Sequence, residues 1–271
     1  LEKVDEHIFI TEASKDYHIK SYPTYNSVST VIHNGIDKSK FYKVSQEEQN
    51  NLKNQNEVAS DTCIFLWLSQ DRKKKGLDVI LSLWEEFIQQ HPKAVLWIVG
   101  TDREVLQSNV KVWGRIPNDQ LPEIYQSVDV YLFPTLCEEG FGLTLVEALS
   151  CGCYCIASKK GGINEVLNNG TYGVLIENPN KKELWLQEMK IAYHLFLKEK
   201  LDGIVNLPED KYSLETWTQE MNKILKDGNQ ALVENNKQLA KANEDVKEMA
   251  YNTIDNAKFI LQHFKDAPNF S

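Results

Sequence analysis

Two carboxylates flank a glycine-rich turn in the stretch CEEGFGLTLVEALSCG, which covers residues 137–152. Glu139 and Glu147 stand eight positions apart. Between them, ahead of an apolar run with helical spacing, come Gly140, Phe141, Gly142, Leu143 and Thr144. Glycines before a helix let the main chain approach a ligand closely, and the unpaired N–H groups of the first turn favour an anion such as a phosphate.

The two carboxylates need a different partner, because a negative charge beside a phosphate is repelled by it. Glu139 precedes the turn, and Glu147 lies about one turn inside the expected helix. Both can accept hydrogen bonds from neutral hydroxyl groups on opposite sides of the anion. Hydroxyls at both ends and phosphate in the middle describe a nucleoside-diphosphate sugar. The alternative from these residues alone is a tight turn with two surface glutamates.

Positive charge gathers in a second loop, at Arg72-Lys73-Lys74-Lys75, directly before Gly76. Such a run is commonly a solvated loop, so this reading stays open beside phosphate binding. The formal net charge of −9 argues against a nucleic-acid-binding protein, which needs an extended basic face.

The elements around these loops alternate between strands and helices. Apolar runs predict strands at 63–68, 94–99, 110–113, 130–133, 153–157 and 173–176. Helical spacing predicts helices at 77–90, 119–127, 144–149 and 163–167. Continuous apolar strands separated by helices favour a doubly wound, Rossmann-like parallel sheet, an α/β fold covered on both faces. The loop at 134–142 then lies at the carboxyl edge of the sheet, where such folds bind ligands.

Two flanking segments differ from this pattern. Residues 7–10, 12–19 and 28–32 predict one strand–helix–strand unit that is too small to fold alone. Residues 182–199, 214–226 and 231–264 predict polar helices. Leu232, Leu239 and Val246 recur at intervals of seven, which is too few positions to establish a coiled coil, so we expect a helix packed on a neighbouring domain. We therefore divide the chain into residues 1–36, 37–205 and 206–271.

Several other functions find no support in the sequence. The glycine turn lacks the third glycine of G-x-G-x-x-G, and no G-x-x-x-x-G-K-[ST] phosphate loop occurs. The five cysteines form no metal-binding pattern, and Cys151, Cys153 and Cys155 are expected to be buried thiols. Unpaired thiols fit a reducing, cytoplasmic location, with the cytoplasmic membrane face as an alternative.

The stretch PTLCEEGFGLTLVEALSCGCYCIASKKGGINEV resembles the donor-site signature of family 4 retaining glycosyltransferases, which have the GT-B fold. The shared marks are the E-x7-E pair, the intervening G-F-G and the G-G-x-x-E of residues 161–165. VIHNGID at 31–37, followed by Phe41, resembles the interdomain stretch of that family, and Lys75-Gly76 its phosphate-binding loop. Ordered landmarks extend over about residues 4–176.

The resemblance implies transfer of a sugar from a nucleotide-diphosphate sugar to an acceptor hydroxyl with retention of configuration. Glu139 would hold the sugar hydroxyls, and Lys75, helped by Arg72, would neutralise the leaving diphosphate; these are the expected catalytic residues. Glu147 would hold the ribose. The remaining expected substrate-binding residues are Gln70, Ile116 near the base, Gly140, Phe141, Gly142, Leu143 and Thr144.

The resemblance implies no cofactor and no metal ion, because cations of the protein and a helix N-terminus take that place. The implied partners are the nucleotide-diphosphate sugar, an unidentified acceptor (a glycan, a lipid or a protein) and an N-terminal acceptor domain. Residues 1–36 resemble only the end of that domain. We therefore expect this chain to bind a nucleoside diphosphate and to transfer no sugar by itself.

One departure from the family pattern concerns the basic loop. The family has an arginine five residues before the lysine, where this sequence has Gln70. Arg72 is expected to supply the missing guanidinium; otherwise the phosphate is held less tightly. This departure keeps open a non-catalytic nucleotide-sugar-binding module, whereas the E-x7-E pair disfavours a nucleotide-sugar epimerase. His7, His18 and His33 are interpreted as structural residues.

Overall fold

The computed structural model of the 271-residue chain describes residues 6–199, 201 and 207–265, with side chains as far as residue 249. It divides into two compact units, Leu1–Thr218 and Gln219–Ser271.

The main sheet of the first unit has six parallel strands. They are β3 (Cys63–Leu68), β4 (Ala94–Val99), β5 (Val110–Gly114), β6 (Val130–Phe133), β7 (Tyr154–Ser158) and β8 (Val174–Ile176). Their order across the sheet is β5-β4-β3-β6-β7-β8, and every neighbouring pair is parallel. This is the doubly wound order 3-2-1-4-5-6, so the predicted fold class is confirmed. The chain changes direction across the sheet between β3 and β6.

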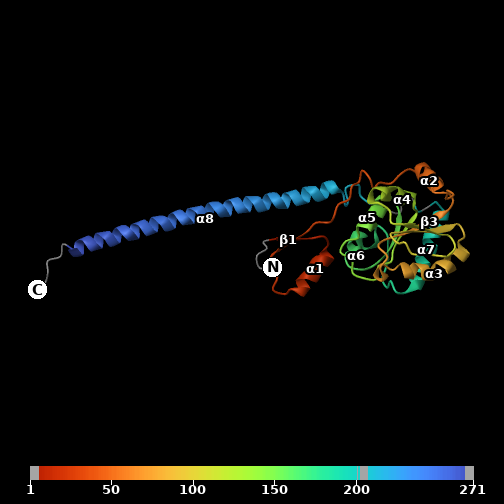
Figure 1. Ribbon diagram of the computed structural model, residues 1–271, viewed down its shortest axis with the longest axis horizontal. Helices are drawn as coiled ribbons and strands as arrows, with labels where there is room; N and C mark the ends of the chain where they lie inside the picture. Colours follow the sequence, from red (N-terminus) through yellow and green to blue (C-terminus); the bar gives the residue numbers. More distant parts are fainter. Residues whose placement is uncertain (1–5, 200, 202–206, 266–271) are drawn as a thin grey trace. The chain divides into compact units, whose positions relative to one another are not determined.

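Helices cover both faces of this sheet, as Figure 1 shows. One face carries α3 (Leu77–Gln90) and α7 (Lys182–Leu197), which bury large side chains such as Trp84, Phe87 and Trp185 against the strands. The other face carries α4 (Leu121–Ser127), α5 (Leu143–Ser150) and α6 (Ile163–Val166). The apolar spacing of α3 faces the sheet because residues three and four apart share one side of a helix.

The N-terminal strand–helix–strand unit forms as predicted. It consists of β1 (Glu6–Phe9), α1 (Glu12–Ser21) and β2 (Val28–Val31), and its two strands pair in parallel. Thr11 caps α1, since its hydroxyl accepts a hydrogen bond from the main-chain N–H of Ser14. The domain boundaries proposed at residues 36 and 205 stay predictions.

A polar helix that sequence analysis missed, α2 (Gln46–Gln55), packs beside α4. Its Lys53 is fully buried and lies 2.8 Å from a carboxylate oxygen of Asp129, the residue before β6. The same carboxylate accepts a hydrogen bond of 2.7 Å from the main-chain N–H of Ile64 in β3. This ion pair therefore fastens α2 to the amino ends of the two central strands.

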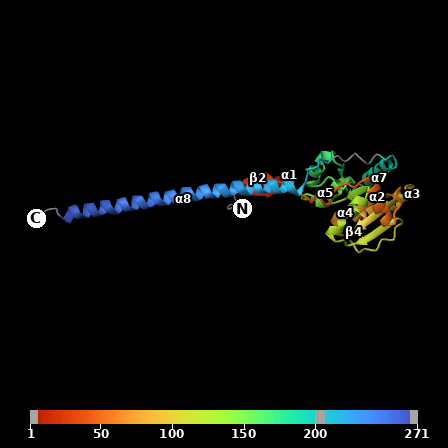
Figure 2. The same ribbon diagram turned by 90° about the horizontal axis from the view of Figure 1, so that it is seen from above.

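The last helix corrects the prediction of separate helices at 214–226 and 231–264. A single helix, α8, runs without interruption over Leu214–Lys265 (Figures 1 and 2). Gly228, which lies between the two predicted helices, adopts helical geometry with open space around it. The first predicted C-terminal helix, at 182–199, corresponds to α7. Among the described helices, none combines the length and apolarity that crossing a bilayer requires.

Candidate donor-sugar site

Two loops meet at the point where the strand order reverses. The loop after β3 contains the basic run, and the loop after β6 contains the glycine-rich turn. The main-chain N–H of Leu136 donates to the carbonyl of Lys74 over 2.7 Å, and the indole N–H of Trp67 donates to the carbonyl of Lys75 over 3.1 Å. Adjacent parallel strands place both loops at the carboxyl edge of the sheet, so residues more than 60 positions apart in the sequence become neighbours.

Glycine is required where the two loops cross. Gly76 has a φ of +74°, and a Cβ atom there would lie 1.8 Å from the carbonyl oxygen of Pro134. No rotation of a side chain relieves such a contact with main chain, so any larger residue must separate the loops. The glycine of the predicted K-G pair therefore sets the distance between the two halves of the site.

Lys75 and Glu139 form an ion pair across this junction. The ammonium Nζ of Lys75 lies 2.5 Å from Oε1 of Glu139, and both side chains are mostly buried. The hydroxyl of Thr135 donates to the same oxygen over 2.7 Å. The structure thus brings together the two residues that sequence analysis placed at the centre of the chemistry. Thr135 was missed; only its place at the end of a buried strand could have indicated it.

The other three cations of the basic run, and Gln70 before it, are exposed to solvent. Gln70, Arg72, Lys73 and Lys74 are exposed, and their side chains have no hydrogen bond or ion pair with the described part of the chain. Lys75 is therefore the cation of the run that contacts Glu139, and Arg72 stays a predicted helper.

A second arginine holds the basic loop from the side. Arg103, after β4, binds the carboxylate of Asp71 through two nitrogens at 2.9 and 2.6 Å, and it also contacts Asp78 of α3 at 2.5 Å. These contacts raise the pKa of Arg103 and lower that of Asp71. Since two carboxylates already neutralise Arg103, it does not replace the arginine that is missing at Gln70. Sequence analysis missed this clamp.

The turn between the glutamates leads directly into α5. Gly142 begins the helix with a φ of +88°, and a Cβ atom there would lie 2.8 Å from Cδ1 of Ile163. The main-chain N–H of Leu145 donates back to the carbonyl of Gly142 over 3.0 Å. The N–H groups of Gly142, Leu143 and Thr144 precede that bond and have no acceptor within the described residues, so they can bind an anion.

Glu147 lies one turn inside α5, as expected, and is partly buried. Its carboxylate accepts a hydrogen bond of 2.9 Å from the hydroxyl of Tyr125 in α4. Burial raises the pKa of the Glu147 carboxyl, and the bond from Tyr125 opposes that rise only in part. A second tyrosine, Tyr131 in β6, donates to the hydroxyl of Thr144 over 3.0 Å. These two tyrosines were not foreseen.

A desolvated carboxylate destabilises the fold, so Glu147→Gln should raise the melting temperature at neutral pH by about 2–4 °C for each kcal/mol gained. The native carboxyl holds its proton more tightly than the unfolded chain, whose pKa is near 4.5. The contribution of the Glu147 carboxyl to the free energy of unfolding therefore falls as pH rises through the pKa of the native state. The gain in melting temperature from Glu147→Gln should vanish when the pH is below the pKa of the unfolded chain. Thermal unfolding at several pH values measures this. An equal gain in exposed Glu123→Gln would contradict this assignment.

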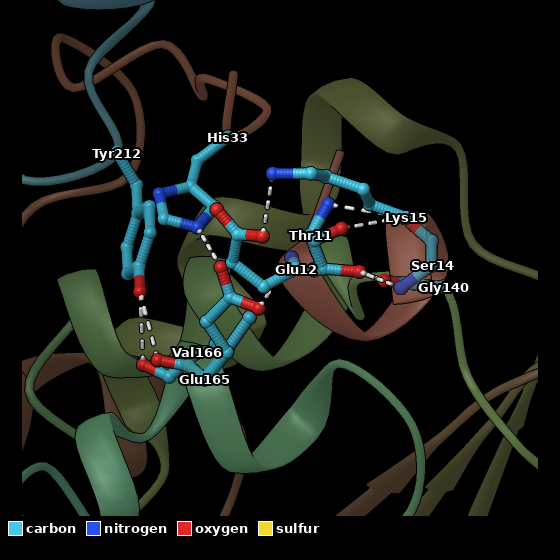
Figure 3. A network of polar contacts seen from close by, with 9 residues as sticks. All are labelled: Thr11, Glu12, Ser14, Lys15, His33, Gly140, Glu165, Val166 and Tyr212. Atoms are coloured by element: carbon cyan, nitrogen blue, oxygen red, sulfur yellow. Dashed lines mark hydrogen bonds and ion pairs between the residues drawn. The ribbon is translucent and has the colours of Figure 1, made fainter. Parts of the chain in front are cut away.

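The G-G-x-x-E segment packs against the glycine-rich loop. The main-chain N–H of Gly162 donates to the carbonyl of Glu139 over 2.8 Å. From the other side, the hydroxyl of Thr11 donates to the carbonyl of Gly140 over 3.0 Å. Figure 3 shows Thr11 and Gly140 in this contact. The loop that carries Glu139 is therefore held by both α6 and the N-terminal unit.

Glu165, the last residue of that motif, binds two parts of the N-terminal segment (Figure 3). One oxygen lies 2.6 Å from Nε2 of His33, and the other accepts a hydrogen bond of 2.8 Å from the main-chain N–H of Glu12. The hydroxyl of Tyr212 donates to the carbonyl of Val166 over 3.1 Å. This network gives His33 a structural contact, in agreement with its interpretation.

Two predicted substrate-binding side chains pack away from solvent. The ring of Phe141 is 3% exposed, stacks on His33 and meets Tyr212 edge to face, so only its main chain can meet a ligand. Ile116 is half-buried at the edge of the core, beyond β5. Nearby, the ammonium of Lys111 lies 3.9 Å from the centre of the Trp113 ring. Within the residues whose side chains are described, no group of histidine, cysteine and carboxylate side chains has a metal-binding arrangement.

The family of the chain follows from a family model. The model of the glycosyl transferases group 1 family matches residues 48–191, which is just over half of the chain. The chain belongs to this family. The matched region contains both site loops, so the resemblance to GT-B glycosyltransferases is confirmed.

Curated proteins named as glycosyltransferases align with this chain over part of their length. The gpi3 subunit of the phosphatidylinositol N-acetylglucosaminyltransferase of Schizosaccharomyces pombe is 32% identical over 41% of this chain and 26% of its own. The lipopolysaccharide 1,2-N-acetylglucosaminetransferase of Salmonella typhimurium is 25% identical over 66% of this chain and 52% of its own. The chain thus spans between a quarter and about half the length of these relatives.

Solved structures share the fold at low sequence identity. HepE of Anabaena, crystallised with UDP and glucose, matches with a TM-score of 0.64 and 19% identity over 83% of this chain and 64% of its own. The C-terminal domain of the glycosyl transferase LpcC of Francisella tularensis matches with a TM-score of 0.56 and 20% identity over 66% of this chain and its entire length. These likenesses establish the fold.

Proposed function

We propose that this chain supplies the donor site of a retaining glycosyltransferase, which moves a sugar from a nucleotide-diphosphate sugar to an acceptor hydroxyl. The observation that carries the proposal is the meeting of Lys75 and Glu139, at 2.5 Å, where the strand order reverses. The cation, the carboxylate and the free N–H groups before Leu145 all belong to the two loops that meet here, which suits a ligand with both phosphate and hydroxyl groups. The complexes of HepE with UDP and with UDP-glucose support this ligand class.

Each group has a distinct role in this proposal. The diphosphate binds at the start of α5 and replaces the carboxylate of Glu139 as the negatively charged partner of Lys75. Glu139, released from the ion pair, accepts hydrogen bonds from sugar hydroxyls and fixes the anomeric carbon. As the sugar–phosphate bond breaks, Lys75 stabilises the charge that grows on the leaving diphosphate. Glu147 accepts hydrogen bonds from the ribose hydroxyls, which take the place of water around its carboxylate. No metal ion or cofactor is assigned a role.

The second candidate is a module that binds a nucleotide sugar without reaction. The observation that favours it is the exposed Gln70 at the family's arginine position, with Arg72 also pointing into solvent. Release of free nucleoside diphosphate in the presence of an acceptor separates the two functions. The measurement needs the whole protein, because the activity is proposed for that protein and not for this chain alone.

The decisive binding experiment uses the basic run. Lys75→Ala should weaken binding of UDP or GDP by about tenfold to a hundredfold, because a hydrogen bond to a charged group contributes about 1.5–3 kcal/mol. Binding of the corresponding nucleoside, which has no phosphate, should be unchanged. Titration calorimetry with both ligands measures the difference.

Lys73→Ala is the matched control, since Lys73 lies in the same turn and is exposed. It removes the same charge from the loop and should leave both affinities within about twofold, as expected for a screened surface charge. Equal losses in the two variants would show that only the total charge of the loop matters, and the assignment of Lys75 would then be wrong.

A further inference from the structure

The part of α8 in the second unit carries two superimposed repeats of seven residues. Apolar side chains recur at Leu225, Leu232, Leu239 and Val246. Three positions before each of them stands an asparagine: Asn222, Asn229, Asn236 and Asn243. Positions three apart lie on the same side of a helix, so the two repeats form one stripe. In heptad notation the asparagines occupy position a and the apolar residues position d.

This stripe has no partner within the described chain. The four apolar side chains are 58–62% exposed, so no other part of the described chain covers them. All four asparagines are exposed, and none forms a side-chain hydrogen bond with another described residue. An exposed row of apolar side chains that extends over four heptads is unfavourable in water and marks a contact surface. Because α8 is uninterrupted, Leu225 extends the repeat to four positions, whereas the expected packing on a neighbouring domain stays a prediction.

We propose that a second copy of this chain covers the stripe, forming a parallel, in-register, two-stranded coiled coil over residues 222–249. The asparagines select this partner. In a parallel pair each asparagine faces its own copy, and two amide groups satisfy each other as donor and acceptor. An antiparallel pairing would place asparagine against leucine and bury unpaired amides, which is costly. A parallel pairing shifted by one heptad would keep asparagine against asparagine but leave the first and last layers of the stripe without a partner.

The charges along the helix permit the same arrangement. Positions e and g, which flank the stripe, hold no carboxylate over residues 222–249 and only two lysines, Lys226 and Lys247. The acidic residues Asp227, Glu234, Glu244, Asp245 and Glu248 occupy the outer positions b, c and f. Two copies therefore approach without repulsion between carboxylates.

The test compares the oligomeric mass of the 271-residue chain with that of two double variants, by light scattering across the micromolar range. The unaltered chain should have twice the monomer mass. Leu232→Glu/Leu239→Glu should reduce it to that of a monomer. Gln230→Glu/Gln238→Glu adds the same two charges on the outer face and should leave the dimer intact. Thermal unfolding of the first unit, equal in all three proteins, shows that the variants fold.

Cross-linking tests the direction and register of the helices. Asn229→Cys should form a disulfide between copies on mild oxidation, because only parallel helices in register bring this position close to itself. Glu234→Cys, on the outer face, should not, since its Cα atoms lie farther apart than a disulfide spans. The unaltered chain, whose thiols are mostly buried, measures the background.

A monomeric chain at these concentrations would overturn the proposal, and so would a dimer that survives Leu232→Glu/Leu239→Glu. A trimer or tetramer, or a dimer without the Asn229→Cys cross-link, would also overturn it. Association with vesicles by a chain that stays monomeric would assign the stripe to a membrane surface instead. None of these results depends on nucleotide binding, so failure here leaves the proposed function unaffected.

Discussion

Lys53→Met is expected to lower the free energy of unfolding of the first unit by about 3–5 kcal/mol. Lys53 is fully buried, and its ammonium binds both oxygens of Asp129 at 2.9 and 2.8 Å. Methionine keeps the length of the side chain but removes the charge, so the carboxylate is left buried without a counter-ion. Because burial already raises the pKa of Asp129, the deficit should shrink as acid protonates this carboxyl. Urea unfolding at two pH values measures both effects.

Two controls separate this loss from a general loss of charge. Lys93→Met removes the same group from an exposed pair with Asp61, in which both side chains are more than 60% exposed, and should cost at most about 1 kcal/mol. The double variant Lys53→Met/Asp129→Asn should recover most of the stability, because its amide oxygen still accepts the hydrogen bond from Ile64 while no charge is buried. A double variant as unstable as the single one would assign the loss to packing.

The sequence predicted elements well where apolar runs were continuous. The buried strands β3, β4 and β6 and the helix α3 were predicted with the bounds that the structure has. By contrast, α2 was missed because Leu52 is its one apolar residue and its buried side chain is a lysine. Ser45, which caps this helix with a glutamate three residues later, was the available signal. Patterns of apolar residues cannot reveal a helix that is held by an ion pair.

Local sequence patterns were limited in the same way at the candidate site. Motifs identified Lys75 and Glu139 separately, but their contact depends on β3 and β6 being neighbours, which only the strand order supplies. The supports around them, Thr135, Tyr125 and the Arg103–Asp71 clamp, come from four different segments and carry no local pattern. In α8, Gly228 lies between the two helices that were predicted separately. A glycine weakens a helix by about 1 kcal/mol, which is too little to interrupt this one.

Glu139→Ala is expected to separate the two ends of the donor. Affinity for free UDP, or GDP, should stay unchanged or increase, because Lys75 loses its competing carboxylate. Affinity for the matching nucleotide sugar should fall by about tenfold to a hundredfold relative to the free diphosphate, since hydrogen bonds from sugar hydroxyls to a charged acceptor are lost. In the whole protein, turnover should fall by about a hundredfold, because misplacing the anomeric carbon by about 1 Å has an effect of that size.

Glu147→Ala should behave differently, because free diphosphate and nucleotide sugar carry the same ribose. Both affinities should fall by one common factor, about tenfold, so that the ratio between the two ligands is unchanged. Glu138→Ala is the matched control, because Glu138 precedes Glu139 in the sequence. Its side chain is 71% exposed and forms a long surface ion pair of 3.7 Å with Lys160. Both affinities should therefore stay within about twofold of those of the unaltered chain. Calorimetric titration of the two ligands into the three variants gives six affinities. If Glu139→Ala weakened both ligands equally, Glu139 would not bind the sugar, and the ion pair with Lys75 would be a support of the loop alone.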